Sequence, residues 1–301
     1  MWALILNRTL VAIPTLFIVT VFVFVLQRML PGDPLLVMAG EERDPTVLAE
    51  LRRYYGFDQP LPVQFLVWLR EVLSGNLGAS LRTGEPVLAV ASITIALAIG
   101  IPMGIVSAVR KGTWVDTLAN VVSLSGLSIP NFWLGIILIL VVAVHLRWLP
   151  ASGFVSVFHD PVRAFQTTVL PAFVLGSGLA AALMRHTRSA MLEVLSLDYI
   201  RTARAKGLLP RAVILKHAFR NALVPIVTLA TLLFGQLLAG AVLTEQVFTI
   251  PGFGKLVVDA VFNRDYPVVQ GVVLVVAVIY VGLNLAADVL YVLINPRLRH
   301  A

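Results

Sequence analysis

Long runs of apolar residues alternate with shorter polar segments along this chain. Six runs are long enough to cross a bilayer, whose hydrocarbon core takes about 20 apolar residues of helix. They cover residues 9–27, 87–109, 117–145, 168–190, 223–243 and 268–293. A transmembrane β-barrel would instead show segments of about ten residues with alternating polarity. The pattern therefore predicts an all-α polytopic membrane protein, a bundle of six transmembrane helices.

The first apolar run has two interpretations, a cleaved signal peptide or a permanent span. It extends from Thr9 to Gln27, which is longer than a typical signal-peptide core, and no Ala-x-Ala site precedes the turn at 31–34. We therefore expect residues 1–27 to form an uncleaved N-terminal transmembrane helix.

The polar segments set the expected organisation of the rest. Residues 28–86 form an extracytoplasmic segment, in which apolar residues at helical spacing over 46–55 and 62–73 predict short surface helices. A core over 87–294 holds the other five spans and an inner loop at 191–222. Residues 295–301 form a cytoplasmic tail.

Individual prolines and glycines predict local features of the spans. Pro130, Pro171 and Pro225 are expected at kinks or in first turns. Gly100-x-x-x-Gly104, with Pro102 between the two glycines, can bring two helices close together or bend the second span.

Composition agrees with a membrane protein, and the position of the charges gives its orientation. Hydrophobic residues make up 58% and charged residues 13% of the chain, and the net charge is +7. With the N-terminus inside, the inner segments carry 13 Lys and Arg against three acids, and the outer segments carry 10 against 12. Excess Lys and Arg mark cytoplasmic loops. Both termini are therefore expected in the cytoplasm, and the basic charge requires no nucleic-acid partner.

Common catalytic and metal-binding patterns are missing from the sequence. There is no cysteine, no Gly-x-x-x-x-Gly-Lys-Ser/Thr loop, no His-Glu-x-x-His and no Gly-x-Ser-x-Gly. We expect no catalytic residue, no metal site and no cofactor, so the chain is not expected to be an enzyme.

The inner loop predicts a short helix followed by a sharp turn. Ser196 or Asp198 can cap the helix start, and cations from Arg201 onward favour its end. Gly207 suits a left-handed position after the helix, and Pro210 suits the first turn of a second helix that ends near Asn221.

Two roles for this short helix remain open on physical grounds. Ala203 and Gly207 would place small residues on one face, which permits close approach of a partner protein. Alternatively, a basic helix can lie on anionic lipid headgroups.

The loop resembles the cytoplasmic EAA loop of ABC importer permeases, in the variant of the dipeptide/oligopeptide permease family. The resemblance rests on YIRTARAKG from Tyr199 to Gly207 and KHAFRNALVP from Lys216 to Pro225. The general motif has Glu-Ala-Ala where this chain has Arg201-Thr202-Ala203, so its Glu is absent here.

Further stretches carry the same resemblance over the whole chain. They are LPGDP at 30–34, GASLRTGEPV at 78–87, GLSIPNFWLG at 126–135, EQVFTIPGFG at 245–254, RDYPVVQG at 264–271 and DVLYVLINPR at 288–297. Between Pro86 and Gly100 the chain is shorter than the family pattern.

The resemblance implies a type I ABC importer permease fold and a coupling helix that sits in a groove of a cytoplasmic ATPase. The residues expected to couple to that ATPase are Asp198, Tyr199, Arg201, Ala203, Arg204, Lys206, Gly207 and Arg211. The implied partners are a second homologous permease, two cytoplasmic ATP-binding subunits, an extracytoplasmic solute-binding protein and membrane lipid. The implied location is the inner membrane of a bacterium.

The implied substrate is a short peptide, with nickel, glutathione or another small solute as alternatives within the family. A secondary transporter is a rival of another class, which would show inverted repeats and interrupted helices around coupling ions. The sequence shows no such repeats.

Three polar residues lie at membrane depth. Polar and ionisable groups in spans need a partner or a wet cavity, and often mark a transport pathway. Gln236 and Asn284 are therefore candidates for lining the translocation path. Asp288 is either a third path residue or one member of an anchoring ion pair with Lys111, Arg297 or Arg299.

Overall fold

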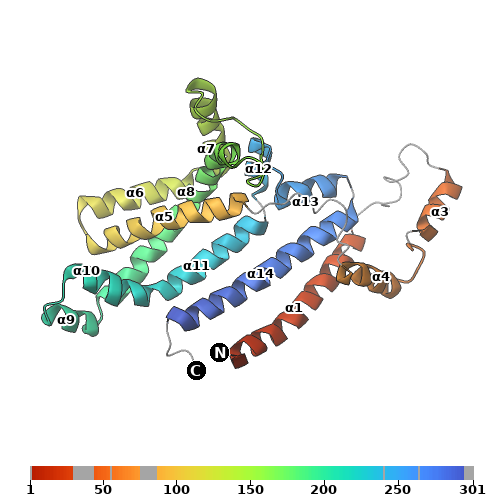
Figure 1. Ribbon diagram of the computed structural model, residues 1–301. Coiled ribbons are helices and arrows are strands. Elements are labelled where there is room, and N and C mark those ends of the chain that lie inside the picture. The colour runs from red at the N-terminus through yellow and green to blue at the C-terminus, as the bar shows by residue number, and fades with distance from the viewer. Residues whose placement is uncertain are drawn as a thin grey trace. The chain divides into compact units, whose positions relative to one another are not determined.

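The computed structural model describes residues 2–29, 44–54, 56–74, 87–239, 241–263 and 265–294. Every regular element among these residues is helical (Figure 1). The motifs at 30–34 and 78–86 and the tail with Arg297 and Arg299 lie outside the described residues. The chain divides into two units, residues 85–250 with 282–301 and residues 2–84 with 251–281.

The first unit is built around α8 (Pro161–Leu195), a helix of 35 residues. Asp160 caps its start by accepting hydrogen bonds from the amides of Val162 (3.1 Å) and Arg163 (3.0 Å). The other elements of the unit are α5 (Val87–Val109), α6 (Trp114–Ser128), α7 (Asn131–Leu138), η2 (Ile139–His145), α9 (Asp198–Ala205), α10 (Pro210–Ala212), η3 (Val213–Phe219), α11 (Arg220–Ala239), α12 (Val242–Phe248) and the end of α14 (Tyr266–Ile294).

Helices α5 and α8 touch almost backbone to backbone, and glycines make this possible. A Cβ atom on Gly104 would lie 2.6 Å from Cβ of Thr187, and one on Gly100 would lie 2.7 Å from the carbonyl oxygen of Ala180. Gly176 on α8 has the reciprocal role, since its Cβ would lie 2.8 Å from the carbonyl oxygen of Ser92. The predicted close approach at Gly100-x-x-x-Gly104 is confirmed.

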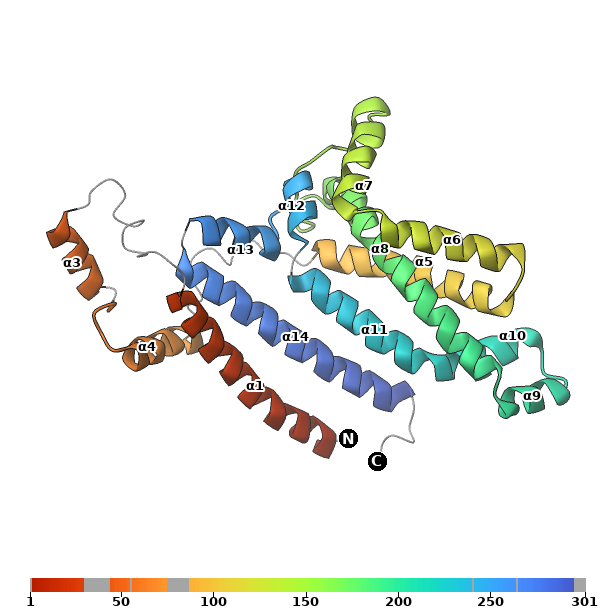
Figure 2. The same ribbon diagram turned by 180° about the vertical axis from the view of Figure 1, so that it is seen from behind.

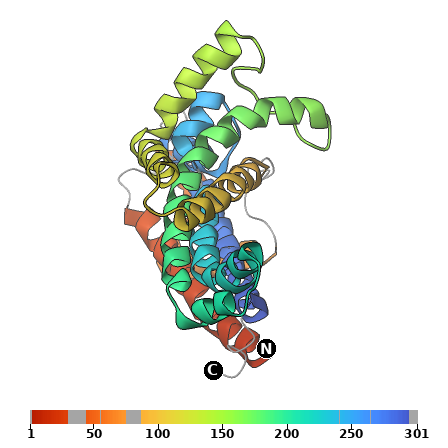
Figure 3. The ribbon, with the colours of Figure 1, turned by 90° about the vertical axis from the view of Figure 1, so that its left-hand side faces the viewer.

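The segment expected as one span over 117–145 is broken near Pro130. Helix α6 ends at Ser128, and Asn131 begins α7, which continues as the π-helix η2. The two halves are bent by 96° to each other (Figure 3). Pro130 precedes the first residue of α7, where its missing N–H costs nothing but its ring prevents the chain from continuing α6. The break at Pro130 agrees with the expected kink, and the span predicted over 117–145 is present as a sharply bent helix pair.

The region after the inner loop also differs from expectation. A second helix ending near Asn221 was predicted before the next span, but one continuous helical stretch runs over Pro210–Ala239. Within it, η3 is a π-helix, so the chain changes its hydrogen-bond pattern without ending the helix.

The second unit contains α1 (Trp2–Met29), α3 (Pro45–Tyr54), α4 (Leu61–Leu73), α13 (Phe253–Phe262) and the first part of α14. The two short helices predicted at 46–55 and 62–73 are thus confirmed as α3 and α4. Helix α4 lies beside one end of α1 (Figure 2). Aromatic rings join the two helices, with the Phe65 centroid 5.4 Å from that of Phe24 and 6.3 Å from that of Phe17.

Among the described residues, four helices are long and apolar enough to cross a membrane. They are Val87–Val109, Pro161–Leu195, Pro210–Ala239 and Val268–Tyr291, and the bent pair α6 and α7 raises the count to as many as five. The first predicted span lies in α1, whose described apolar part is Leu10–Val25.

Candidate functional site

The predicted short helix of the inner loop is confirmed as α9, which begins three residues after α8 ends. Its boundaries follow from local chemistry. Gly207 has φ +75°, a left-handed conformation that glycine adopts without steric cost, and Pro210 starts the next helix. The turn therefore separates α9 from the stretch that leads into α11, as Figure 2 shows.

The cap of α9 was predicted incorrectly. Leu197 occupies the N-cap position and no side chain caps the helix. The hydroxyl of Ser196 instead donates to the carbonyl oxygen of Glu193 at 2.7 Å, so it closes the end of α8. Asp198 lies in the first turn of α9, where its negative charge interacts favourably with the positive end of the helix dipole.

The outward face of α9 and its turn is cationic. The side chains of Arg201, Arg204, Lys206 and Arg211 are all exposed. Arg201 lies 3.5 Å from the Asp198 carboxylate, and this pair is 77% and 94% exposed, so it contributes little to stability. No carboxylate in the described part of the chain pairs with Arg204, Lys206 or Arg211. Three unpaired cations therefore face outward together.

The inward face of α9 is anchored in the core of the first unit. Ile200 is fully buried and Ala203 is 7% exposed, both within one apolar cluster with Met191 and Val213. Ala203 was expected to share an outward face of small residues with Gly207, but Gly207 is exposed and Ala203 is not. Ala203 therefore packs α9 against its own chain, and Gly207 is the exposed member of the two.

Tyr199 ties α9 to the start of α11. Its hydroxyl accepts a hydrogen bond from the Asn221 side-chain amide at 2.9 Å and lies 3.4 Å from the carbonyl oxygen of His217. The Asn221 amide also donates to that carbonyl at 2.8 Å. His217 belongs to η3, and π-helical turns often occur at functional sites. The sequence pattern could not reveal this contact, which joins residues 22 positions apart.

The three candidate path residues lie on α11 and α14. Gln236 and Asn284 are exposed and Asp288 is half-buried. Sequence analysis missed a hydrogen bond that joins the same two helices. The Tyr291 hydroxyl donates to the Thr228 hydroxyl at 2.8 Å. Both residues are individually common in spans, so only their pairing identifies them.

Sequence analysis also missed Glu245, which is buried in α12. Its carboxylate accepts a hydrogen bond from the amide of Ala241 at 2.9 Å. At the end of α12, the Phe248 ring packs against Gly135 of α7, so closely that a Cβ atom added at Gly135 would lie 3.0 Å from the ring. The available signal was the acidic residue directly after the apolar run of α11.

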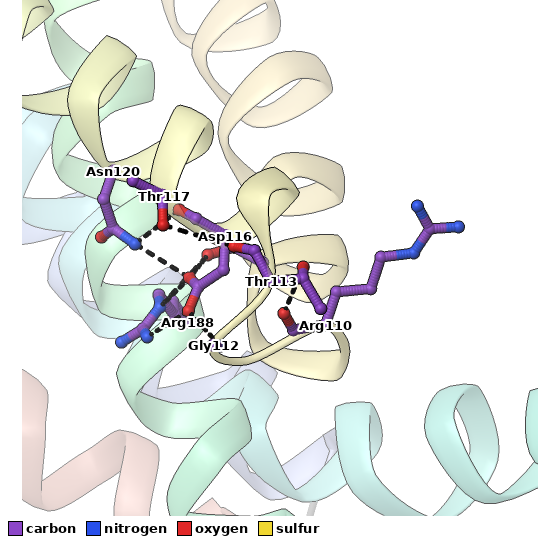
Figure 4. A network of polar contacts seen from close by, with 8 residues as sticks. Arg110, Gly112, Thr113, Asp116, Thr117, Asn120 and Arg188 are labelled. Atoms are coloured by element: carbon purple, nitrogen blue, oxygen red, sulfur yellow. Dashed lines mark hydrogen bonds and ion pairs between the residues drawn. The ribbon is translucent and has the colours of Figure 1, made fainter.

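The most extensive polar network in the described residues surrounds Asp116 and was also missed (Figure 4). One carboxylate oxygen accepts from Ser107 Oγ (2.6 Å), Arg188 Nε (2.8 Å) and Asn120 Nδ2 (2.8 Å). The other accepts from the Gly112 amide (3.0 Å) and Arg188 Nη2 (2.9 Å). The carboxylate therefore connects α5, α6, the turn between them and α8. These residues are scattered over 82 positions, and no local pattern joins them.

No group of three or more His, Cys, Asp or Glu side chains among the described residues could hold a metal ion. The arrangement of the inner loop suits docking, since α9 offers exposed cations on a helix that is fixed from behind.

Comparison with known proteins covers almost the whole chain. Residues 100–300 match the family described as the binding-protein-dependent transport system inner membrane component, and residues 1–102 match the N-terminal region of such membrane components.

Three relatives illustrate the similarity. The chain is 44% identical to the di/tripeptide transport system permease protein DppB of Pseudomonas aeruginosa, over 96% of both chains. It is 43% identical to the dipeptide transport system permease protein DppB of Escherichia coli K12, over 98% of both chains. It is 42% identical to the glutathione transport system permease protein GsiC of Escherichia coli O6:H1, again over 98% of both chains.

Proposed function

The chain belongs to the family of binding-protein-dependent transport system inner membrane components, and we propose that it forms half of the path by which an ABC importer carries short peptides. As a member of this family it is a multi-pass permease of the inner membrane. The observation that carries the peptide assignment is the 43–44% identity to dipeptide and di/tripeptide permeases over nearly full length.

The proposed topology has six membrane crossings and both termini in the cytoplasm. It is supported by the excess of Lys and Arg in the segments 1–8, 110–116, 185–222 and 295–301. Because the chain has no cysteine, single introduced cysteines report on it without background. Ser196→Cys should react with a membrane-impermeant maleimide only after permeabilisation, whereas Ser152→Cys, in an outer loop, should react in intact cells. Labelling of Ser152→Cys only after permeabilisation, and of Ser196→Cys in intact cells, would show that the topology is the reverse of the proposed one.

The proposed partners follow from what this chain lacks and what α9 presents. Its sequence has no phosphate-binding loop, so ATP hydrolysis must come from two cytoplasmic ATP-binding subunits. The exposed cations Arg201, Arg204, Lys206 and Arg211 on and after α9 would face one of these subunits. A second homologous permease would complete the path, and an extracytoplasmic binding protein would deliver the substrate.

The proposed path is lined by α11 and α14. Gln236 and Asn284 are exposed on these helices, and Asp288 lies one turn after Asn284. Exposed amides in a span are costly against lipid but are satisfied in a water-filled path. Movement of α9 on ATP binding would then change the packing of the helices around this path, as alternating access requires.

A glutathione permease is the second candidate. The 42% identity to a glutathione permease is within two percentage points of that to the dipeptide permeases, so overall similarity does not separate the two substrates. Both are short peptides in the chemical sense, and the binding protein would select between them.

Reconstitution tests the whole proposal. The chain, its second permease, both ATPases and the binding protein would be placed in proteoliposomes, and uptake of labelled dipeptide and glutathione would be followed. We expect ATP-dependent dipeptide uptake that requires every component, and no hydrolysis by this chain alone. Hydrolysis by the isolated chain would contradict the subunit assignment, and uptake of glutathione but not dipeptides would favour the second candidate.

A further inference from the structure

The Asp116 network joins elements that the proposed function has not yet used. Asp116 is on α6, Ser107 on α5 and Arg188 on α8. Arg188 lies ten residues before Asp198, the first residue of α9, and only Ser196 and Leu197 separate α8 from α9. A displacement of α9 is therefore passed to Arg188 through this two-residue link and about two turns of α8.

The ion pair between Arg188 and Asp116 has a rigid geometry. Arg188 donates through Nε and Nη2 to different oxygens of the Asp116 carboxylate, at 2.8 and 2.9 Å. Two parallel bonds fix the angle between the groups as well as their distance. The Asp116 side chain is 7% exposed and that of Arg188 is 24% exposed, so water competes weakly for either.

The rest of the network extends this restraint to α5. Ser107 donates to Asp116 at 2.6 Å and accepts from Arg188 Nε at 3.1 Å, so it touches both charged groups. The amide of Gly112, in the turn between α5 and α6, donates to the second carboxylate oxygen. Farther along the same helix pair, α6 contacts α8 through a neutral hydrogen bond, from Ser123 Oγ to the carbonyl oxygen of Ala181.

We propose that Asp116 and Arg188 are positioning residues for energy coupling, which lock the α5–α6 hairpin to α8 so that motion of α9 carries the hairpin with it. This inference rests on the proposed docking of an ATPase at α9. The glycine contacts hold α5 close to α8. The Asp116–Arg188 pair prevents α6 from sliding or rotating on α8. Without the ion pair, α9 moves but the α5–α6 hairpin does not follow it. ATP is then hydrolysed without the change in helix packing that transports substrate.

The first test measures the substrate transported per ATP hydrolysed by the complete reconstituted transporter. Arg188→Gln and Asp116→Asn should each lower this ratio about twofold to thirtyfold, the range by which residues between two coupled sites change their coupling. Arg188→Lys keeps the positive charge but cannot make the two parallel hydrogen bonds, so its transport-to-ATP ratio should lie between those of Arg188→Gln and the original chain. Arg185→Gln, an exposed arginine on the same helix, is the matched control and should leave the ratio unchanged.

The second test separates coupling from stability. Spin labels at Ser128→Cys on α6 and Ser196→Cys after α8 would report the hairpin-to-α9 distance in the otherwise cysteine-free chain. Because Gly126 packs against Ala181 and Ser128 lies two residues beyond it, these sites are separated by about 25 Å of helix. In the original chain this distance should be the same with and without trapped ATP, and in Arg188→Gln it should change when ATP binds.

The outcomes discriminate clearly. Unchanged ratios and unchanged distances in the variants overturn the inference, as does a variant that is less stable but keeps the original ratio. If Arg188→Gln does not assemble, Arg188→Lys and Asp116→Asn carry both measurements. Failure of the unsubstituted transporter to couple ATP to uptake would instead contradict the proposed function.

Discussion

Arg188 on α8 and Asp116 on α6 are 72 residues apart in sequence, yet they form two parallel hydrogen bonds of 2.8 and 2.9 Å. Ser107, Gly112 and Asn120 supply three further hydrogen bonds to the same carboxylate. Both oxygens of the Asp116 carboxylate therefore accept hydrogen bonds, and its negative charge is compensated by the Arg188 guanidinium.

Loss of one partner of this pair should destabilise the protein more than loss of both. Arg188→Gln leaves a buried carboxylate without its cation, which costs about 3–5 kcal/mol, whereas Asp116→Asn with Arg188→Gln leaves two neutral amides. Thermal unfolding of the full chain in detergent micelles would measure this. A double variant whose loss equals the sum of the two single losses would show that the residues act independently.

Gly104→Ala should separate α5 from α8. The added Cβ would lie 2.6 Å from Cβ of Thr187 and 2.7 Å from the carbonyl oxygen of Met184, and backbone cannot move aside cheaply. Overpacking of this kind costs about 1–3 kcal/mol. The control is Gly282→Ala on α14, where nothing lies within 4 Å of the new Cβ. Equal unfolding temperatures for the two variants would contradict the close packing.

Gly207→Val should uncouple ATP turnover from transport while the protein still inserts. At φ +75° a β-branched side chain is strained, so the turn after α9 must change shape. Space is not the limit, because nothing lies within 4 Å of a Cβ at this position. Gly207→Asn is the control, since Asn tolerates this conformation. Coupled uptake at the original ratio in Gly207→Val would contradict the role of the turn.

Tyr199→Phe should loosen α9 without displacing it. The substitution removes the hydroxyl that accepts from Asn221 and lies 3.4 Å from the carbonyl oxygen of His217, but retains the ring. Loss of such a hydrogen bond costs about 1 kcal/mol, so the amides of Asp198–Ala205 should exchange hydrogen about fivefold faster. Tyr280→Phe, on α14, serves as the control and should leave exchange in α9 unchanged.

Thr187→Val should be neutral or stabilising. The Thr187 hydroxyl is fully buried and makes no hydrogen bond, while the shape of the side chain fills the contact with Gly104. Valine keeps that shape and removes a polar atom whose burial costs about 1–3 kcal/mol. Thr187→Ala, which also removes a methyl group, should lower the unfolding temperature. A loss in Thr187→Val as large as in Thr187→Ala would mean that the hydroxyl contributes to stability.

Much of the fold was accessible from local sequence. Apolar runs predicted α5 with the observed bounds and α14 to within two residues, because burial in lipid requires uninterrupted apolar helix regardless of neighbours. They predicted only the central part of α8, which is longer than the expected span at both ends. The short helix α9 and the turn at Gly207 were also predicted, since backbone conformation there depends on glycine and proline chemistry within a few residues.

Tertiary structure alone decided which face of each helix meets which neighbour. The burial of Ala203, the bond from Tyr199 to Asn221 and the network around Asp116 all join side chains that are distant in sequence or depend on helix rotation. A sequence pattern shows that a polar residue is present but not whether a partner satisfies it. Sequence therefore determined a membrane permease with a short basic helix between two spans, and packing determined how that helix is attached to the spans behind it.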